Sequence, residues 1–268
     1  MKYRTTLQQA TALALVLAAS AASANDVALE YTRSERSRGF GAIDHVTVSY
    51  GTSLADKATV QVRLESKRQG ASGIAPAKSG AFLEGIFSYP LTESIYGMTR
   101  VGLTDERTLF IDRSVYQEFG YKLGKFGNAF VDLNGGIGSR RFPSGTEAFL
   151  NVGPTVSWAS GAVWLRREQS LDEGGYRNVF SMAQWLSPQL KFDVGLIGEN
   201  RKKYTLPVAG AVALSRVEST RFSVGATYQM TPKLALTLRA EKVSLEKEGV
   251  PGKYYDPLSI GVGVSLGF

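Results

Sequence analysis

The sequence predicts an all-β protein: a transmembrane antiparallel up-and-down β-barrel of about 14 strands that follows a cleaved signal peptide. Three observations predict this class: a secretory N-terminal segment, alternation of apolar and polar residues with period two, and a final aromatic residue, Phe268. The alternating segments reach about nine to eleven residues, the length of a tilted transmembrane strand. Strands of soluble β-sandwiches usually span about five or six residues, so the membrane barrel is favoured.

The composition excludes several kinds of chemistry. The 268 residues include no cysteine and one histidine. The chain therefore has no disulfides, no Cys-ligated zinc, no Fe–S cluster and no thiol nucleophile. A mean hydropathy of −0.09 argues against a helical membrane bundle. We expect no cofactor, no metal and no catalytic group.

Residues 1–24 have the features of a signal peptide, which leaves residues 25–268 for the barrel. Lys2 and Arg4 precede an apolar stretch too short to span a bilayer as a helix, and small residues at 22–24 form a cleavage motif. Removal of Lys2 and Arg4 takes 31 basic residues to 29 against 24 acidic ones, so the mature charge is +5. We expect the outer membrane of a Gram-negative cell and no nucleic-acid partner.

The alternation recurs along the mature chain and is clearest at its end. It is evident at 60–65, 190–196, 222–229, 234–241 and 258–268. In the last of these segments every even position is apolar and every odd position is Ser or Gly. A terminal aromatic residue on such a strand resembles the signal that the barrel-assembly machinery recognises. The residues of this predicted signal are Val264, Leu266 and Phe268.

Short turns and longer connections alternate, which sets the strand number and orientation. The short turns are Thr52–Lys57, Leu91–Ser94, Gly124–Gly127, Ala159–Gly161, Ser187–Gln189 and Thr231–Lys233. The longer connections are Arg36–Ala42, Gln69–Ser79, Asp105–Asp112, Ser139–Gly145, Leu171–Gly175, Arg201–Val217 and Glu246–Asp256. They predict about 14 strands with both termini on the short-turn, periplasmic side. Twelve strands is the alternative, because 95–122 and 162–186 alternate less cleanly.

Aromatic residues gather at the turn-side ends of the strands, as in an interfacial girdle. They are Tyr50, Tyr89, Tyr96, Tyr121, Trp158, Trp164, Trp185, Phe192, Tyr228 and Phe268.

The face opposite the apolar one carries charges of both signs and would line the lumen. These residues are Glu30, Arg63, Glu65, Glu84, Arg100, Glu118, Lys122, Asp132, Lys191, Asp193, Arg239 and Glu241. Charges away from water must pair or line a water-filled channel, so either a partial water path or a lumen closed by ion pairs and inserted loops is expected. The apolar connection 201–217 either extends its two strands, which we favour, or folds inward.

Basic residues cluster toward the long-loop side, where outer-leaflet phosphates of lipopolysaccharide would meet them. The more specific alternative is that this cluster attracts an anionic solute or polymer. The cluster comprises Arg36, Arg38, Lys67, Arg68, Arg140, Arg141, Arg201, Lys202 and Lys203.

The single histidine, His45, shares a predicted lumen face with Thr47 and Ser49. No His–Asp–Ser motif surrounds it, so we expect a hydrogen-bonded polar residue rather than an enzyme.

The chain resembles the YaiO-like outer-membrane β-barrel proteins. The similarity is clearest at 170–178 (SLDEGGYRN) and is weaker at 99–102 and 110–113. The resemblance implies an outer-membrane barrel linked with exopolysaccharide export, and polysaccharide-export components as partners.

The leading functional hypothesis is a passive pore or accessory barrel for passage or export of a polar solute or exopolysaccharide. The alternatives are a closed structural or adaptor barrel that binds a partner through its loops and, less favoured, an enzyme at the lumen rim that modifies lipid or glycan with His45.

Overall fold

The computed structural model describes most of the mature chain. The described residues are 26–35, 41–54, 57–72, 76–106, 109–142, 145–172, 174–201, 204–205, 213–214, 217–247 and 253–268. The predicted signal peptide lies outside them. In the described part of the chain, no helix is long and apolar enough to cross a membrane.

The described elements are β-strands, most of them ten to fifteen residues long. The long strands are β1 (Asp26–Glu35), β2 (Ile43–Ser53), β3 (Thr59–Gln69), β4 (Lys78–Pro90), β5 (Ile95–Thr104), β6 (Arg113–Phe126), β7 (Ala129–Phe142), β8 (Gly145–Trp158), β9 (Gly161–Ser170), β10 (Tyr176–Trp185), β11 (Leu190–Arg201), β14 (Val217–Thr231), β15 (Leu234–Lys247) and β17 (Leu258–Gly267). The short ones are β12 (Tyr204–Thr205), β13 (Ala213–Leu214) and β16 (Lys253–Tyr255).

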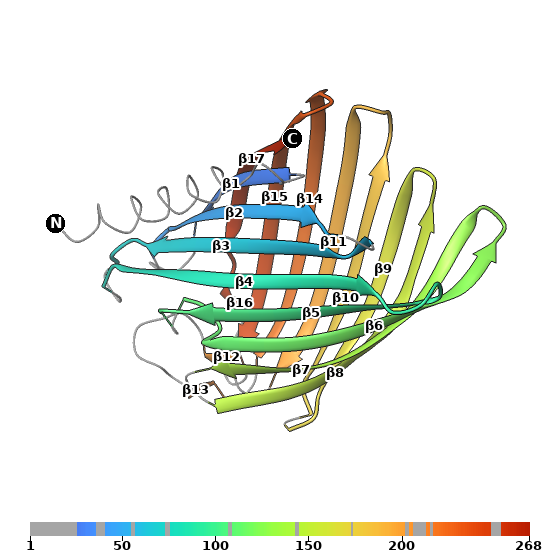
Figure 1. The fold of residues 1–268 in the computed structure, drawn as a ribbon. Coiled ribbons are helices and arrows are strands. Elements are labelled where there is room, and N and C mark those ends of the chain that lie inside the picture. The colour runs from blue at the N-terminus through green and yellow to red at the C-terminus, as the bar shows by residue number, and fades with distance from the viewer. Residues whose placement is uncertain are drawn as a thin grey trace.

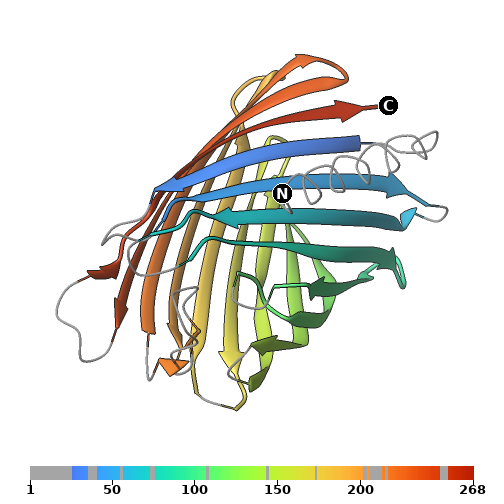
Figure 2. The ribbon, with the colours of Figure 1, turned by 90° about the vertical axis from the view of Figure 1, so that its left-hand side faces the viewer.

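The 14 long strands form one closed antiparallel barrel. Successive strands pair in chain order, and β16 adds a short edge to β15 within the 15-stranded sheet. The first and last strands close the cylinder, with Asp26 opposite Gly267 and Glu35 opposite Leu258. Figure 1 shows the strands side by side around the wall, and Figure 2 shows β1, in blue, beside β17, in red. Closure leaves no unpaired sheet edge in the bilayer, and it confirms the predicted fold and strand number.

The two ends of the barrel differ as the turn pattern predicts. The β6–β7 and β8–β9 hairpins turn within two residues, at 127–128 and 159–160. One predicted long connection is wrong: β7 continues to Phe142 and β8 starts at Gly145, so Ser139–Arg141 are strand residues. The connection 201–217 contains the β12–β13 hairpin, which forms its own two-stranded sheet. Residues 202–203, 206–212 and 215–216 lie outside the described chain.

The exterior of the barrel is apolar because every second residue points outward. Exposed large hydrophobic residues lie on the outer face of all the long strands except β2, β3 and β10. They include Leu29, Leu83, Val101, Phe119, Leu133, Leu150, Leu165, Leu196, Val224, Leu238 and Val262. Such a surface would be unfavourable in water and fits the hydrocarbon region of a bilayer. The molecule is thus an outer-membrane β-barrel, as the sequence predicts.

Glycines on the inner wall make room for aromatic rings. A Cβ at Gly102 would lie 2.4 Å from the Phe82 ring, and a Cβ at Gly138 would lie 2.4 Å from the Phe149 ring. Phe149 stacks on Tyr116 with ring centroids 5.8 Å apart. These rings therefore lie flat against the wall, where the absence of a side chain admits them.

The β8–β9 ladder is interrupted at one point, and an arginine compensates for it. Pairing runs from Phe149 to Val152 and resumes at Thr155, since Pro154 cannot donate a backbone hydrogen bond. The Nη1 of Arg166 lies 3.2 Å from the Gly153 carbonyl oxygen and 2.9 Å from that of Pro154. The guanidinium thereby contacts backbone carbonyls at the point where β8 and β9 do not pair.

Candidate functional site

The lumen contains two cavities that share part of their lining. The first has a volume of about 950 Å³ and the second about 600 Å³. Residues from β3, β14 and the β5–β6 connection line both cavities, so the two spaces adjoin. The shared residues are Arg63, Glu65, Lys67, Leu109 and Arg221. Most of the residues that line the two cavities are charged or polar, as in a water-accessible passage.

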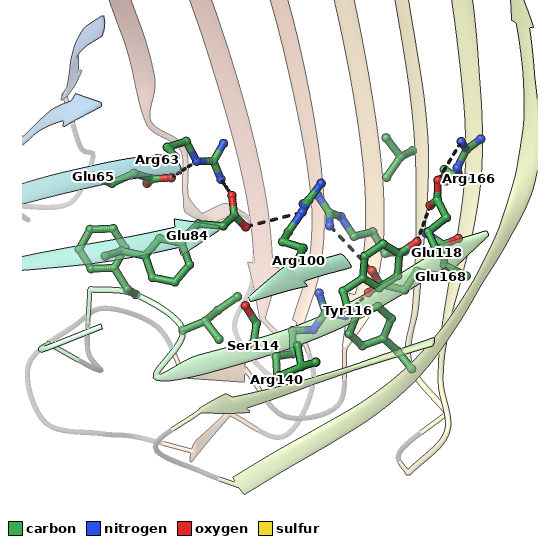
Figure 3. A pocket seen from close by; sticks show the side chains of 18 of the residues that line it. Arg63, Glu65, Glu84, Arg100, Ser114, Tyr116, Glu118, Arg140, Arg166 and Glu168 are labelled. Carbon is green, nitrogen blue, oxygen red and sulfur yellow. Dashed lines mark hydrogen bonds and ion pairs between the residues drawn. The ribbon is translucent and has the colours of Figure 1, made fainter. Parts of the chain in front are cut away.

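A chain of ion pairs crosses three neighbouring strands in the first cavity (Figure 3). Arg63 on β3 lies with Nε 3.0 Å from Glu65 Oε1 and with Nη2 2.6 Å from Glu84 Oε2. The other oxygen of Glu84 lies 3.7 Å from the Nε of Arg100 on β5. Because alternate residues of adjacent strands point to the same face, these four side chains meet in the lumen.

Burial differs between the two members of these pairs. Arg63 and Arg100 are 36% and 40% exposed, whereas the Glu84 side chain is 5% exposed. Glu65 is 12% exposed beside the same Arg63. The carboxylates therefore lie against the wall, and the guanidinium groups face the lumen. A solute in the cavity meets cationic hydrogen-bond donors first, although the net charge of the pairs is small.

A second network in the first cavity, on the neighbouring strands β6 to β9, is more enclosed. Buried Arg140 on β7 contacts Glu147 on β8 at 3.1 Å and also Glu168 on β9. Arg140 also lies over the Phe149 ring, 4.1 Å from its centroid. Arg166 Nη2 lies 3.7 Å from Glu118 across the intervening strands. These contacts tie β6 through β9 together inside the barrel.

The second cavity has its own charges. Arg239 lies 3.9 Å from Glu30 and 3.7 Å from Asp193, and so joins β15 to β1 and β11. Arg221 lies 3.7 Å from Glu241. Again the arginines are more exposed than their partners.

Residues 109–111 of the β5–β6 connection, here called the inward segment, fold into the lumen. Inserted loops are one of the alternatives expected from the sequence, but this segment is not singled out there. Leu109 is buried and lines both cavities. Phe110 stacks on Phe82 of β4 with centroids 5.6 Å apart, and Lys67 Nζ lies 4.2 Å from the Phe110 centroid. The apolar run Leu109–Ile111 inside a loop expected to be exposed was the available signal.

The remaining predicted lumen charges lie nearer the short-turn end. The Tyr96 hydroxyl donates to Asp132 at 3.3 Å, and Lys122 Nζ donates to the Glu93 carbonyl at 2.8 Å. Lys191 Nζ lies 5.7 Å from the Trp185 ring. Within the predicted C-terminal signal, Val264 pairs with Leu29 and with Leu236, and Leu266 pairs with Val27 and Leu234.

Two sequence-based groupings need correction. The Tyr96 hydroxyl donates hydrogen bonds to Asp132 and Asn134, and Trp164 lines the first cavity, so neither residue belongs to a lipid-facing girdle. Trp185 is opposite Lys191 on the adjacent strand and shares its lumen face, so it does not belong to the girdle either. In the predicted basic belt, Lys67 and Arg140 line the lumen. Arg36, Arg38, Lys202 and Lys203 lie outside the described residues.

His45 lies in the second cavity without the geometry of a catalytic triad. Its Nε2 is 2.9 Å from Glu65 Oε2 and 3.3 Å from Thr47 Oγ1. A triad base contacts the carboxylate with one ring nitrogen and the nucleophile with the other. Here both partners meet the same nitrogen, so Thr47 is not activated in that way. Among the described residues, no group of three or more His, Cys, Asp or Glu side chains forms a potential metal site.

Comparison with known proteins identifies the fold only. No family model matches the chain, and no curated protein matches it. An outer-membrane channel from Pseudomonas putida F1 is similar in structure, with TM-score 0.52, 18% identity, and coverage of 91% of this chain and 96% of that chain. The Pseudomonas putida toluene transporter TodX has TM-score 0.52, 12% identity and coverage of 91% and 89%. The outer-membrane protein OprD from Pseudomonas aeruginosa has TM-score 0.50, 10% identity and coverage of 91% and 94%.

Proposed function

We propose that this barrel is a passive outer-membrane pore that lets small polar solutes cross. The observation that supports the proposal most strongly is the pair of adjoining cavities, lined by charged side chains, inside a closed wall. Charged residues in a membrane barrel are stable where water or partners solvate them. Both conditions are met in this lumen, since the arginines are partly exposed and also paired.

The mechanism is electrostatic and requires no cofactor. The apolar exterior holds the barrel in the bilayer, while lumen charges replace part of the hydration shell of a passing solute. Arg63 and Arg100 supply donors, and the buried Glu84 limits the local positive charge. Binding that is shared among several sites stays weak enough for release.

Planar-bilayer conductance tests the pore. The purified barrel should give stepwise conductance in KCl, and the same protein after heat denaturation should give none. A correctly folded barrel that stays silent in KCl would contradict the proposal.

A closed adaptor barrel is the second candidate, and the inward segment favours it. Leu109 is buried between the two cavities and reduces the free cross-section of the lumen. Zero conductance together with copurification of a stable stoichiometric partner would support this candidate over the pore.

The narrower proposals rest on sequence. The 170–178 segment supports membership of the YaiO-like group, with an exopolysaccharide as the solute and export components as partners. Loss of secreted polysaccharide on deletion of the gene, restored by the intact gene, would support them. Unchanged polysaccharide secretion would remove them.

Two partner proposals concern the membrane. The terminal Val264, Leu266 and Phe268 would engage the barrel-assembly machinery, and arginines of the predicted basic cluster such as Arg68 and Arg141 would meet lipopolysaccharide phosphates. Phe268→Ala should lower the amount of barrel in the outer membrane, whereas Leu258→Ala on the same strand should not. Equal amounts of both variants would contradict the first proposal.

We also propose that the protein is not an enzyme. The geometry at His45 supports this, because its two contacts share one nitrogen. Loss of a measured lipid or glycan turnover in His45→Ala, but not in Ser49→Ala, would overturn it.

A further inference from the structure

We propose that the first cavity binds a small carboxylate with an aromatic body, such as benzoate, on its passage through the barrel. This inference rests on the proposed pore and adds the class of solute. Three features of the cavity carry it: the balance of charge, the orientation of the charged groups, and an apolar wall beside them.

The cavity lining is rich in guanidinium groups. Seven basic residues line it against four acidic ones. The basic residues are Arg63, Lys67, Arg100, Arg140, Arg166, Arg177 and Arg221, and the acidic ones are Glu65, Glu84, Glu118 and Glu168. Glu147 adds one carboxylate behind Arg140. The excess of positive charge favours an anion over a cation.

The orientation of the ion pairs increases this preference. All four lining carboxylates have little exposed side-chain surface, whereas Arg63, Arg100 and Arg221 are exposed to the lumen. The Nε of Arg100 lies 3.7 Å from Glu84, which is longer than an N–H···O hydrogen bond. This Nε is itself buried, so the donors that meet a planar, two-oxygen acceptor such as a carboxylate are the Nη groups of this 40%-exposed side chain.

An apolar wall faces the same space and is not explained by passage of a simple salt. Phe110 and Ile111 come from the inward segment, Phe142 from the end of β7, Met98 from β5, and Trp164 from β9. Phe110 is fixed by stacking on Phe82, so its position does not depend on a bound solute. A flat apolar body can contact these groups while its carboxylate meets the arginines. Ligand sites of about 300–1,000 Å³ hold small molecules, and this cavity has about 950 Å³.

Binding to the detergent-purified barrel, measured by isothermal titration calorimetry, tests the inference with three probes. Benzoate combines charge and ring, acetate has the charge alone, and benzamidine has the ring with the opposite charge. We expect benzoate to bind at least about tenfold more tightly than either of the others, since a charge-assisted hydrogen bond and an apolar contact each contribute that much. Benzamidine binding as tightly as benzoate would overturn the anion preference, and acetate binding as tightly would overturn the apolar subsite.

Two variants test whether the arginines bind the carboxylate of benzoate and whether the apolar wall binds its ring. Arg100→Gln should weaken benzoate and acetate about tenfold, whereas Phe110→Ala should weaken benzoate and leave acetate unchanged. Lys233→Gln, in the β14–β15 turn outside the lumen, is the charge-loss control and should change neither. Unaltered benzoate affinity in both cavity variants would place the ligand elsewhere and overturn the assignment. If a variant fails to fold, the comparison of the three probes on the natural chain still decides the outcome.

The same preparation separates failure of this inference from failure of the pore. If the barrel conducts KCl but does not bind benzoate more tightly than acetate and benzamidine, the proposed pore stands and the proposed preference for aromatic carboxylates is wrong. A barrel that binds benzoate but is silent in KCl retains the binding site and loses the pore.

Discussion

The Nη2 of Arg63 lies 2.6 Å from Oε2 of Glu84, and of the two side chains only the arginine reaches the lumen water to a large extent. The same relationship holds for Arg100, Arg221 and Arg239, whose guanidinium groups are more exposed than their partners, so these arginines add to the excess of basic residues that line the first cavity. The charge that a solute meets is therefore set by side-chain depth as well as by the number of residues of each sign.

Glu84→Gln should increase the preference of the pore for anions. The change removes the carboxylate that contacts both Arg63 and Arg100, so Arg63 keeps Glu65 as its partner and Arg100 loses the carboxylate at 3.7 Å. The reversal potential under a KCl gradient should shift toward the chloride equilibrium potential. Glu93→Gln, at the exposed β4–β5 turn, is the control, and an equal shift in both variants would contradict this account.

Arg140→Ala should destabilise the barrel. Glu147 and Glu168 would lose the cation between them, and removing one partner of a buried charge network costs about 3–5 kcal/mol. Since water in the lumen lowers this cost, we expect about 2 kcal/mol. Urea unfolding in detergent measures this loss of stability, and the temperature at which the folded band disappears on SDS gels should fall with it. Arg33→Ala at the exposed rim should change stability by less than about 0.5 kcal/mol, and equal losses would contradict the prediction.

Gly153→Ala should destabilise the β8–β9 junction. A Cβ at this position would lie 2.0 Å from the Leu165 carbonyl oxygen, a backbone atom that accepts a hydrogen bond from Arg166 Nη1 at 2.9 Å. Such overpacking costs about 1–3 kcal/mol. Gly85→Ala is the matched control, since nothing lies within 4 Å of a Cβ there. Similar unfolding midpoints for the two variants would show that the junction tolerates the added methyl group.

Leu109→Ala should widen the passage and raise single-channel conductance. The side chain is buried where the two cavities adjoin, and its truncation removes volume from the inward segment. A buried Leu→Ala change also costs about 2–5 kcal/mol, so folding must be verified first. Leu171→Ala, in the exposed β9–β10 connection, should leave conductance unchanged. Lower or equal conductance in Leu109→Ala would show that this residue does not restrict the passage.

The fold could be predicted because its determinants are local. Alternation from Leu258 to Phe268 identifies the lipid face directly, and the short turns give the strand count. The same period indicates which charged residues share the inner face, as for Arg63 and Glu84.

The rest depends on tertiary packing. Leu109 is buried only because Phe82 and the neighbouring strands provide a surface for the inward segment, and no periodicity encodes that contact. Arg140 was assigned to the rim because 139–145 was expected to be a loop, whereas the strand continues to Phe142. Trp164 was assigned to the girdle from its position near a turn, although strand parity directs it to the lumen.

The central claim is a conducting barrel whose lumen presents guanidinium groups, and one measurement tests it most directly. The reversal potential of the natural protein should be recorded in a planar bilayer that separates two KCl concentrations. We expect stepwise conductance with a reversal potential on the chloride side of zero. A folded barrel that conducts with cation preference, or that does not conduct, would contradict the claim.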